Sequence, residues 1–207
     1  MNGLVKICGL RDPGNIREVF RLKPDLAGLI FHPKSPRYVS DPLSLAFLNE
    51  WKDRPLIAGV FVNPGMEMIV EVTRVLRLDI IQLHGSESPE MCKTLRRLGY
   101  SVIKAFGIGA DFDFSQTSRY EGMADYFLFD SRSREFGGSG QSFDWSRLVE
   151  YKGATPWLLS GGLTPETTIF PSDSLMAGVD LNSRFESSHG IKDTGLLKQF
   201  LKHYRDE

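Results

Sequence analysis

The sequence lacks several features that would assign it to a class of proteins at once. It contains only two cysteines, Cys8 and Cys92, in 207 residues. Two cysteines are too few for a disulfide framework, and their spacing does not match a metal-binding motif. Unpaired thiols fit a reducing compartment best. We therefore expect a cytosolic protein, which in a bacterium means a cytoplasmic one.

An excess of charge is also missing. The 25 basic and 26 acidic residues leave a formal net charge of -1, and the basic residues form no long run. A surface of this kind gives no reason to expect nucleic acid or an anionic membrane as a partner. No apolar run approaches the roughly 20 residues that cross a bilayer. The N-terminal residues do not resemble a signal peptide, so we expect no membrane association.

What the sequence does contain is a regular alternation of short apolar runs with longer amphipathic ones. This alternation is typical of an α/β fold in which helices connect parallel strands. Eight such units predict a single-domain (β/α)8 TIM barrel over residues 1–207. The expected strands are 3–8, 26–31, 55–62, 79–84, 101–106, 125–130, 156–160 and 177–182. The expected helices are 13–23, 41–52, 64–77, 87–98, 144–151 and 193–204. The signal is weak in 108–121 and in 165–175, where Pro171 should end any helix.

Reactive side chains stand at the ends of three expected strands, namely Cys8, His84 and Asp130. In a closed parallel barrel the ends of the strands meet at one mouth. Alternation along a strand places Lys6 on the same face as Cys8, toward the interior. A nearby ammonium group lowers the pKa of a thiol. These residues predict that Cys8 is a base or a nucleophile, although a lone cysteine is more commonly a small buried hydrophobic residue.

Asp130 and His84 each allow two interpretations. A carboxylate at a barrel mouth can act as a general acid or base. Asp130 can equally cap the following turn or pair with Arg132 or Arg134. His84 shares a strand face with Gln82 and can bind substrate, but a structural histidine bonded to the backbone is the more common case.

Loops that contain glycine follow the last strands. Backbone N–H groups in such loops bind phosphate, and barrel enzymes usually hold phosphate after strands seven and eight. Glycine also serves ordinary turns, but adjacent loops of this kind favour a phosphate site. The candidate phosphate ligands are Gly138, Gly140, Gly161, Gly162, Asn182 and Ser183.

Arg37 lies in the loop after the second expected strand. A guanidinium group can bind a second anion, such as a carboxylate, through two parallel hydrogen bonds. The alternative is a solvated loop arginine. The residues alone therefore predict a barrel enzyme for a small phosphorylated substrate, with a thiol and a carboxylate on separate strands. They do not identify the reaction.

Together these motifs resemble phosphoribosylanthranilate isomerase of tryptophan biosynthesis over essentially the whole chain. The matching motifs, in order, are Lys6-Ile7-Cys8-Gly9, Ser35-Pro36-Arg37, Gly59-Val60-Phe61-Val62-Asn63, Gln82-Leu83-His84-Gly85, Asp130, the Gly137–Gly140 loop, Phe143-Asp144-Trp145, Ser160-Gly161-Gly162-Leu163 and Gly178-Val179-Asp180. The resemblance implies an Amadori rearrangement without cofactor or metal. The substrate would be N-(5-phosphoribosyl)anthranilate, and the product 1-(2-carboxyphenylamino)-1-deoxyribulose 5-phosphate.

The resemblance also implies a role for each matching residue. Asp130 would be the general acid that protonates the ribose ring oxygen, and Cys8 the general base that removes the proton from C2. Arg37 would hold the anthranilate carboxylate, and the late glycine loops the phosphate. The implied substrate-binding residues are Arg37, His84, Gly138, Gly140, Gly161, Gly162, Asp180, Asn182 and Ser183.

The chain departs from the family pattern in the loop after the last strand. The family usually has Ser-Ser-Gly followed by Val-Glu, where residues 182–186 are Asn-Ser-Arg-Phe-Glu. The departure concerns the phosphate ligands in this loop and leaves the acid and the base untouched. The rival interpretations are a related isomerase of histidine biosynthesis, the indole-forming synthase, and a phosphate-binding barrel without activity. The sequence leaves the oligomeric state open between a monomer and a homodimer.

Overall fold

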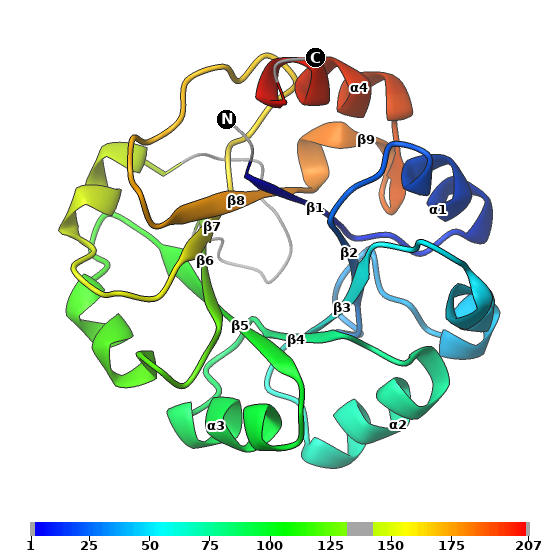
Figure 1. Cartoon of the computed structure of the whole chain (residues 1–207), viewed down its shortest axis with the longest axis horizontal. Helices are drawn as coiled ribbons and strands as arrows, with labels where there is room; N and C mark the ends of the chain where they lie inside the picture. The colour runs from blue at the N-terminus through cyan, green and yellow to red at the C-terminus, as the bar shows by residue number, and fades with distance from the viewer. Residues whose placement is uncertain (1–2, 132–142, 206–207) are drawn as a thin grey trace.

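The computed structural model describes residues 3–131 and 143–205. Eight parallel strands, β1 to β8 in chain order, close into a barrel. Figure 1 shows these strands as a ring, with the helices on its outside. The closed parallel barrel confirms the predicted fold class. The strands are β1 (Leu4–Cys8), β2 (Leu26–Ile30), β3 (Leu56–Phe61), β4 (Ile80–Leu83), β5 (Ser101–Ile108), β6 (Tyr126–Ser131), β7 (Trp157–Leu159) and β8 (Met176–Leu181).

The connections between the strands contain two kinds of helix. The α-helices are α1 (Pro13–Phe20), α2 (Met66–Leu76), α3 (Pro89–Arg97) and α4 (Thr194–Tyr204). The 3-10 helices are η1 (Pro42–Glu50), η2 (Phe114–Tyr120), η3 (Trp145–Glu150) and η4 (Ser183–Phe185). After η4 comes a small antiparallel hairpin, β9 (Glu186–Ser188) with β10 (Ile191–Lys192), which the sequence does not predict. In the described part of the chain, no helix has the length and apolar character needed to span a membrane.

Two of the helices predicted from sequence are wrong in type. The segments 41–52 and 144–151 are predicted as α-helices, whereas the structure has the 3-10 helices η1 and η3 there. In η1, the hydroxyl of Ser44 donates to the carbonyl of Asp41, three residues earlier, and Thr117 makes the same kind of bond in η2. Side-chain bonds of this kind compete with the backbone bonds of an α-helix.

The connection between β7 and β8 has no helix of either kind. Residues 165–175, all of which the structure describes, run as turns and irregular backbone. Pro171 lies in this connection, and proline both lacks an N–H donor and clashes with the preceding helical turn. The barrel is therefore least regular on the side where β7 and β8 lie.

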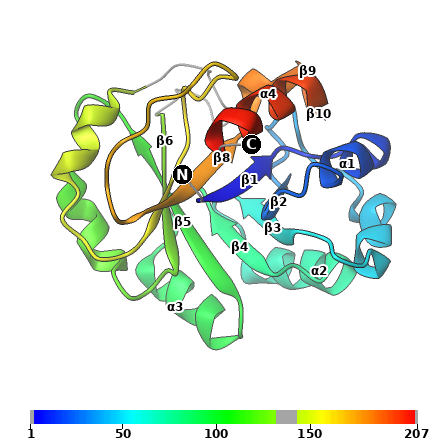
Figure 2. The same ribbon diagram turned by 45° about the horizontal axis from the view of Figure 1, so that its top comes forward.

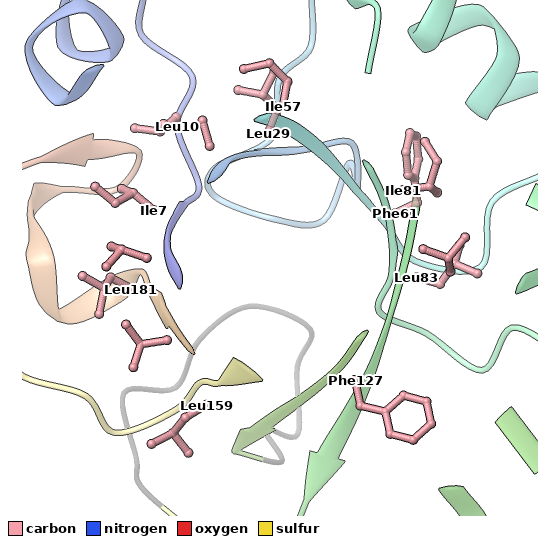
Figure 3. Close-up of a cluster of buried hydrophobic side chains, with 14 of the residues drawn as sticks. Ile7, Leu10, Leu29, Ile57, Phe61, Ile81, Leu83, Phe127, Leu159 and Leu181 are labelled. Atoms are coloured by element: carbon pink, nitrogen blue, oxygen red, sulfur yellow. The ribbon is translucent and has the colours of Figure 1, made fainter. Parts of the chain in front are cut away.

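The strands bury side chains on both faces. Figure 3 shows the side chains that point outward from the ring toward the helices, among them Ile7, Leu29, Phe61 and Phe127. The inward side chains form a separate apolar layer inside the barrel. This layer contains Leu26, Ala58, Ile80, Ile103, Ala105, Leu128 and Leu158. Cys8 packs with Ile30 and Val60 in a smaller cluster nearer the C-terminal ends of the strands.

Three aspartates connect the strands at their N-terminal ends, which form the end of the barrel opposite Cys8. Asp25, Asp79 and Asp125 each stand directly before a strand. Their carboxylates accept hydrogen bonds of 2.8 Å from the backbone N–H groups of Val5, Ile57 and Val102, which lie on the neighbouring strands. These bonds tie adjacent strands together at their N-terminal ends. The C-terminal ends of the strands do not depend on these bonds, so other side chains can occupy that end of the barrel.

Candidate active site

Cys8 is the last residue of β1, and only 3% of its surface is exposed. Its sulfur lies close to Gly28 of β2, since a Cβ atom added to Gly28 would come within 2.7 Å of Sγ. A glycine at this position therefore leaves the space that the thiol occupies. Cys8 faces the interior of the barrel, as the alternation along the strand predicts.

Lys6 and Asp180 form a buried ion pair beside Cys8. The two residues are paired in the register of β1 and β8, and their side chains are 0% and 5% exposed. Nζ of Lys6 lies 2.9 Å from Oδ1 of Asp180. Burial opposes the charge on Lys6, but Asp180 and Cys8 outweigh burial and raise the pKa of its ammonium. Lys6 therefore stays protonated next to the thiol.

The pKa of Cys8 differs from the sequence-based expectation. Burial raises the pKa of its thiol, and the positive charge of Lys6 opposes this rise without cancelling it. The negative charge of Asp180 raises the pKa further. The predicted influence of Lys6 thus has the right sign, but the predicted net lowering is wrong. Desolvation of the thiolate in the barrel is the larger effect.

Asp130 lies in β6, with 20% of its side chain exposed. Its Oδ1 accepts a hydrogen bond of 2.8 Å from the backbone N–H of Ser131. Burial raises the pKa of the Asp130 carboxyl despite this bond and one from the Ser160 hydroxyl. The carboxyl consequently keeps its proton to a higher pH than an exposed aspartate. The alternative partners Arg132 and Arg134 lie outside the described residues.

The structure brings His84 to the same side of the mouth as Asp130. Nε2 of His84 lies 3.6 Å from Oδ2 of Asp130, and Nδ1 lies 2.9 Å from Nε2 of Gln82. Burial, followed by the charges of Lys104 and Lys6, lowers the pKa of His84 to about 4. The ring is neutral near pH 7. When Gln82 donates to Nδ1, the proton of the ring is on Nε2 and faces Asp130.

Gly161, in the loop after β7, lies against Asp130. Its φ is +74°, in the left-handed region that favours glycine. A Cβ atom at this position would lie 2.9 Å from Oδ1 of Asp130 and 2.2 Å from Oγ of Ser131. The neighbouring Gly162 also has a positive φ, of 82°. Gly161 therefore allows the loop to approach the carboxyl, whether or not it also contacts phosphate.

The other predicted phosphate ligands are only partly described. Gly138 and Gly140 lie outside the described residues. Asn182 and Ser183 follow β8, next to the loop after β7, because β7 and β8 are paired neighbours. Nζ of Lys192 donates to Oδ1 of Asn182 over 2.8 Å and to its carbonyl oxygen over 3.2 Å. The side chain of Asn182 is thus held by a lysine of the β9–β10 hairpin.

Arg37 is not a solvated loop arginine, since only 2% of its surface is exposed. Its guanidinium group forms a close ion pair with Glu186, with 2.6 Å between Nη2 and Oε2. The stem of Arg37 crosses Gly9, the residue after Cys8, because a Cβ atom on Gly9 would come within 2.5 Å of Cδ of Arg37. Glu186 and Lys192 have no role in the sequence prediction, although the charges that follow β8 are the signal that could have revealed them.

The mouth of the barrel thus has two chemically different sides. A thiol beside a buried ammonium lies at the end of β1, and a carboxyl with a raised pKa lies near a neutral histidine at the end of β6. Such a pair can remove a proton at one position of a substrate and deliver one at another. Among the described residues, no group of three or more His, Cys, Asp or Glu side chains is placed to hold a metal ion.

Comparisons with known proteins agree on one family. The family model described as "N-(5'phosphoribosyl)anthranilate (PRA) isomerase" matches residues 5–203. An N-(5'-phosphoribosyl)anthranilate isomerase of Parabacteroides distasonis is 47% identical over 203 residues, which cover 96% of this chain and 92% of that protein.

Two crystal structures are also similar over almost their whole length. The phosphoribosyl anthranilate isomerase of Thermotoga maritima has a TM-score of 0.82 at 32% identity, covering 99% of this chain and 100% of that one. A phosphoribosyl anthranilate isomerase in complex with reduced 1-(o-carboxyphenylamino)-1-deoxyribulose 5-phosphate has a TM-score of 0.79 at 30% identity, with the same coverage.

Proposed function

This chain belongs to the N-(5'-phosphoribosyl)anthranilate isomerase family, and we propose that Cys8 and Asp130 are the general base and the general acid of its reaction. The enzyme converts N-(5-phosphoribosyl)anthranilate to 1-(2-carboxyphenylamino)-1-deoxyribulose 5-phosphate in tryptophan biosynthesis. The observation that carries the assignment is the placement of a thiol next to Lys6 and of a carboxyl with a raised pKa at the same barrel mouth.

Asp130 acts first in this mechanism. Its carboxyl donates a proton to the ribose ring oxygen, and the bond between this oxygen and C1 breaks. The nitrogen lone pair forms a double bond to C1, so the ring opens to a protonated Schiff base. Burial of Asp130 raises the pKa of its carboxyl, which keeps the proton available for this step.

Cys8 acts second. Its thiolate removes the proton from C2, and the electrons of that C–H bond form a double bond between C1 and C2 while the imine accepts a pair on nitrogen. The enolamine then gains a proton at C1 and loses the proton of its C2 hydroxyl, which gives the ketone. Substrate and product have the same composition, and the two side chains regain their starting protonation by exchange with solvent. Lys6 stabilises the thiolate.

Arg37 and the loops after the last strands bind the two anionic ends of the substrate. Arg37 holds the anthranilate carboxylate, and the loops after β6, β7 and β8 hold the phosphate. His84 donates from Nε2 near Asp130, and Asp180 positions Lys6. Fixing both ends places C2 next to Cys8 and the ring oxygen next to Asp130, and such positioning supplies part of the rate. The phosphate ligands are Gly138, Gly140, Gly161, Gly162, Asn182 and Ser183.

We also propose that the enzyme works in the cytoplasm. Cys8 must stay reduced to act as a base, and its thiol is unpaired in the structure. A reducing compartment preserves such a thiol. The quaternary structure is that of a monomer or a homodimer.

The assignment is tested by the fluorescence of the anthranilate group, with the unstable substrate generated during the assay. Cys8→Ala and Asp130→Asn should each lower kcat by about 1,000-fold, because general acid–base groups typically contribute factors of about 100 to 10,000. Cys92→Ala, which removes a buried thiol in α3, is the matched control and should retain activity.

Measurements of phosphate binding and of folding distinguish the ways in which this assignment could fail. An inert wild-type protein that still binds inorganic phosphate would point to the phosphate-binding barrel without activity. An active Cys8→Ala variant that is folded by circular dichroism would exclude Cys8 as the base, while leaving the isomerase itself established.

A further inference from the structure

The β9–β10 hairpin contributes two buried charged side chains that the mechanism above does not use. Glu186 and Lys192 are directly paired in its register. Their side chains are 4% and 0% exposed, and the salt-bridge distance between them is 2.7 Å. Figure 2 shows the hairpin beside the C-terminal ends of β1 and β8, which is the end of the barrel that carries the site. Burying two charges is costly unless they are well paired. The contacts of both side chains therefore indicate what their burial does for the site.

Glu186 binds one particular edge of Arg37. Nε of Arg37 lies 2.8 Å from Oε1 and 3.1 Å from Oε2, and Nη2 lies 2.6 Å from Oε2. The carboxylate therefore occupies the edge of the guanidinium plane that carries Nε and Nη2. The other edge, formed by Nη1 and Nη2, has the same two-pronged geometry. Among the described residues none accepts from Nη1, and His189 makes only a long contact of 3.5 Å with Nη2.

Glu186 is itself held from other directions. Nζ of Lys192 donates to Oε1 over 2.7 Å, and the backbone N–H of Gly190 donates to the same oxygen over 3.1 Å. Lys192 is fixed in turn by two oxygens of Asn182. A continuous set of short bonds thus runs from the end of β8 through Lys192 and Glu186 to Arg37. The orientation of the guanidinium plane is set by the fold.

This arrangement also defines the local charge. One carboxylate between the cations of Arg37 and Lys192 leaves a net charge of +1 for the three side chains. A site with one excess positive charge and a free guanidinium edge matches a single carboxylate. It lies beside Cys8, because the stem of Arg37 crosses Gly9.

We propose that Glu186, held by Lys192, is a positioning residue that directs the free edge of Arg37 toward the carboxylate of the substrate's aryl group. Glu186 thereby makes the site selective for an arylamine that carries a carboxylate. This inference rests on the proposed function of Arg37. An arginine side chain has many rotamers, and ordering it during folding removes that entropic cost from substrate binding.

The test compares the binding of two ligands. The first is reduced 1-(o-carboxyphenylamino)-1-deoxyribulose 5-phosphate, and the second is the same compound without the carboxyl group. Isothermal titration gives the ratio of their dissociation constants. Glu186→Gln should lower the preference for the carboxylated ligand by roughly tenfold or more, which corresponds to about one well-oriented charged contact. The dissociation constant of the ligand without the carboxyl group should change by less than about twofold.

Four further variants make the result specific. Glu150→Gln breaks an exposed pair with Arg147 in η3 and should leave the ratio unchanged. Arg37→Met should lower the ratio as much as Glu186→Gln, and combining the two should add nothing further. Glu186→Asp keeps the charge on a shorter stem and protects the fold, so it should still lower the ratio. A full preference in Glu186→Asp would show that charge alone suffices and would overturn the proposal.

The outcome for Glu186 is separate from that for the proposed function. Equal weakening of both ligands in Glu186→Gln would indicate a purely structural role and contradict the proposal. If wild type isomerises the substrate but Glu186→Gln keeps its preference, only the positioning role fails. If wild type neither isomerises the substrate nor distinguishes the two ligands, the proposed function fails with it.

Discussion

The two sides of the barrel mouth differ in charge. At the ends of β1 and β8, Lys6 is paired with Asp180, and Arg37 and Lys192 share Glu186, all in nearly dry surroundings. At the ends of β4 and β6, Asp130 and His84 keep 20% and 29% of their side-chain surface exposed, and the histidine is neutral near pH 7. Burial raises the pKa of the functional group on each side, the Cys8 thiol and the Asp130 carboxyl.

The difference corresponds to the two proton transfers. The base must carry a negative charge to remove a proton from carbon, and fixed cations close to Cys8 favour that charge. The acid must keep its proton until the ring opens, and an uncharged neighbour such as neutral His84 does not promote its loss. Burial therefore raises the cost of a negative charge on both sides of the mouth, and fixed cations offset part of that cost chiefly beside Cys8. Substitutions on each side of the mouth should remove these differences one at a time.

The largest effect is expected on removing the cation closest to Cys8. Lys6→Met leaves Asp180 buried without its partner and should lower the free energy of unfolding by about 3–5 kcal/mol. Lys6→Met/Asp180→Asn, which leaves neither charge, should recover most of that loss. The pKa of Cys8 should nevertheless rise in the double variant, because the effect of Lys6 on this thiol exceeds that of Asp180.

Two measurements on the Lys6 variants check this prediction. Urea unfolding gives the stabilities, and the ultraviolet absorbance of the thiolate gives the pKa in a Cys92→Ala background that leaves one thiol. An unchanged or lower pKa of Cys8 in the double variant would show that the cation does not stabilise the thiolate.

A smaller effect is expected on the neutral side of the mouth. The pKa of His84 is lowered from 6.5 to about 4 in the folded protein. As the pH falls through this interval, the unfolded chain binds a proton that the folded protein does not, so stability falls with pH. The contribution is at most about 3 kcal/mol. His84→Gln should therefore flatten the dependence of stability on pH within this window, as measured by urea unfolding at several pH values.

A second histidine provides the control for this measurement. His203 is exposed on α4, so His203→Gln should keep the pH dependence of wild type. If His84→Gln shows the same slope as wild type, the folded protein binds the proton as readily as the unfolded chain does, and the pKa of His84 is not lowered.

The sequence predicts those features of the site that follow from the alternation of side chains along a strand. Alternation along the strands predicts the barrel and the inward positions of Cys8 and Asp130, because a parallel barrel forces period-2 side chains into its interior. The same rule could have revealed the pair of Lys6 with Asp180, since the first and last strands of a closed barrel are neighbours. That pair needs no information beyond the fold and the parity of the two positions.

Other features depend on distances that the sequence does not contain. The pKa of Cys8 is the balance of burial against two charges, and only the packed structure shows that burial is larger. The buried position of Arg37 depends on the β9–β10 hairpin, whose two short strands give little periodic signal. The 3-10 helices differ from α-helices by one residue in hydrogen-bond spacing, which side-chain bonds such as that of Ser44 can shift.

The last comparison uses alanine variants of two glycines. It separates the effect of backbone strain from the effect of contact with Asp130. Gly161 and Gly122 have nearly the same φ, of +74° and +72°. A Cβ atom at Gly161 would lie 2.9 Å from Oδ1 of Asp130, whereas at Gly122 it would meet nothing within 4 Å. Alanine at Gly122 should cost about 1–2 kcal/mol of stability, because the residue is left-handed. Alanine at Gly161 should cost more, because its Cβ atom would also lie 2.5 Å from the backbone nitrogen of Ser131.

Activity should distinguish these two alanine variants. Gly161→Ala displaces the carboxyl of Asp130 and should lower kcat by roughly tenfold to 100-fold, since displacements of about 1 Å have effects of this size. Gly122→Ala should keep the activity of wild type. Steady-state kinetics and thermal unfolding of both variants check the prediction. If both lose activity equally, the left-handed turn matters only through stability, and the close approach of the β7 loop to Asp130 has no part in positioning the acid.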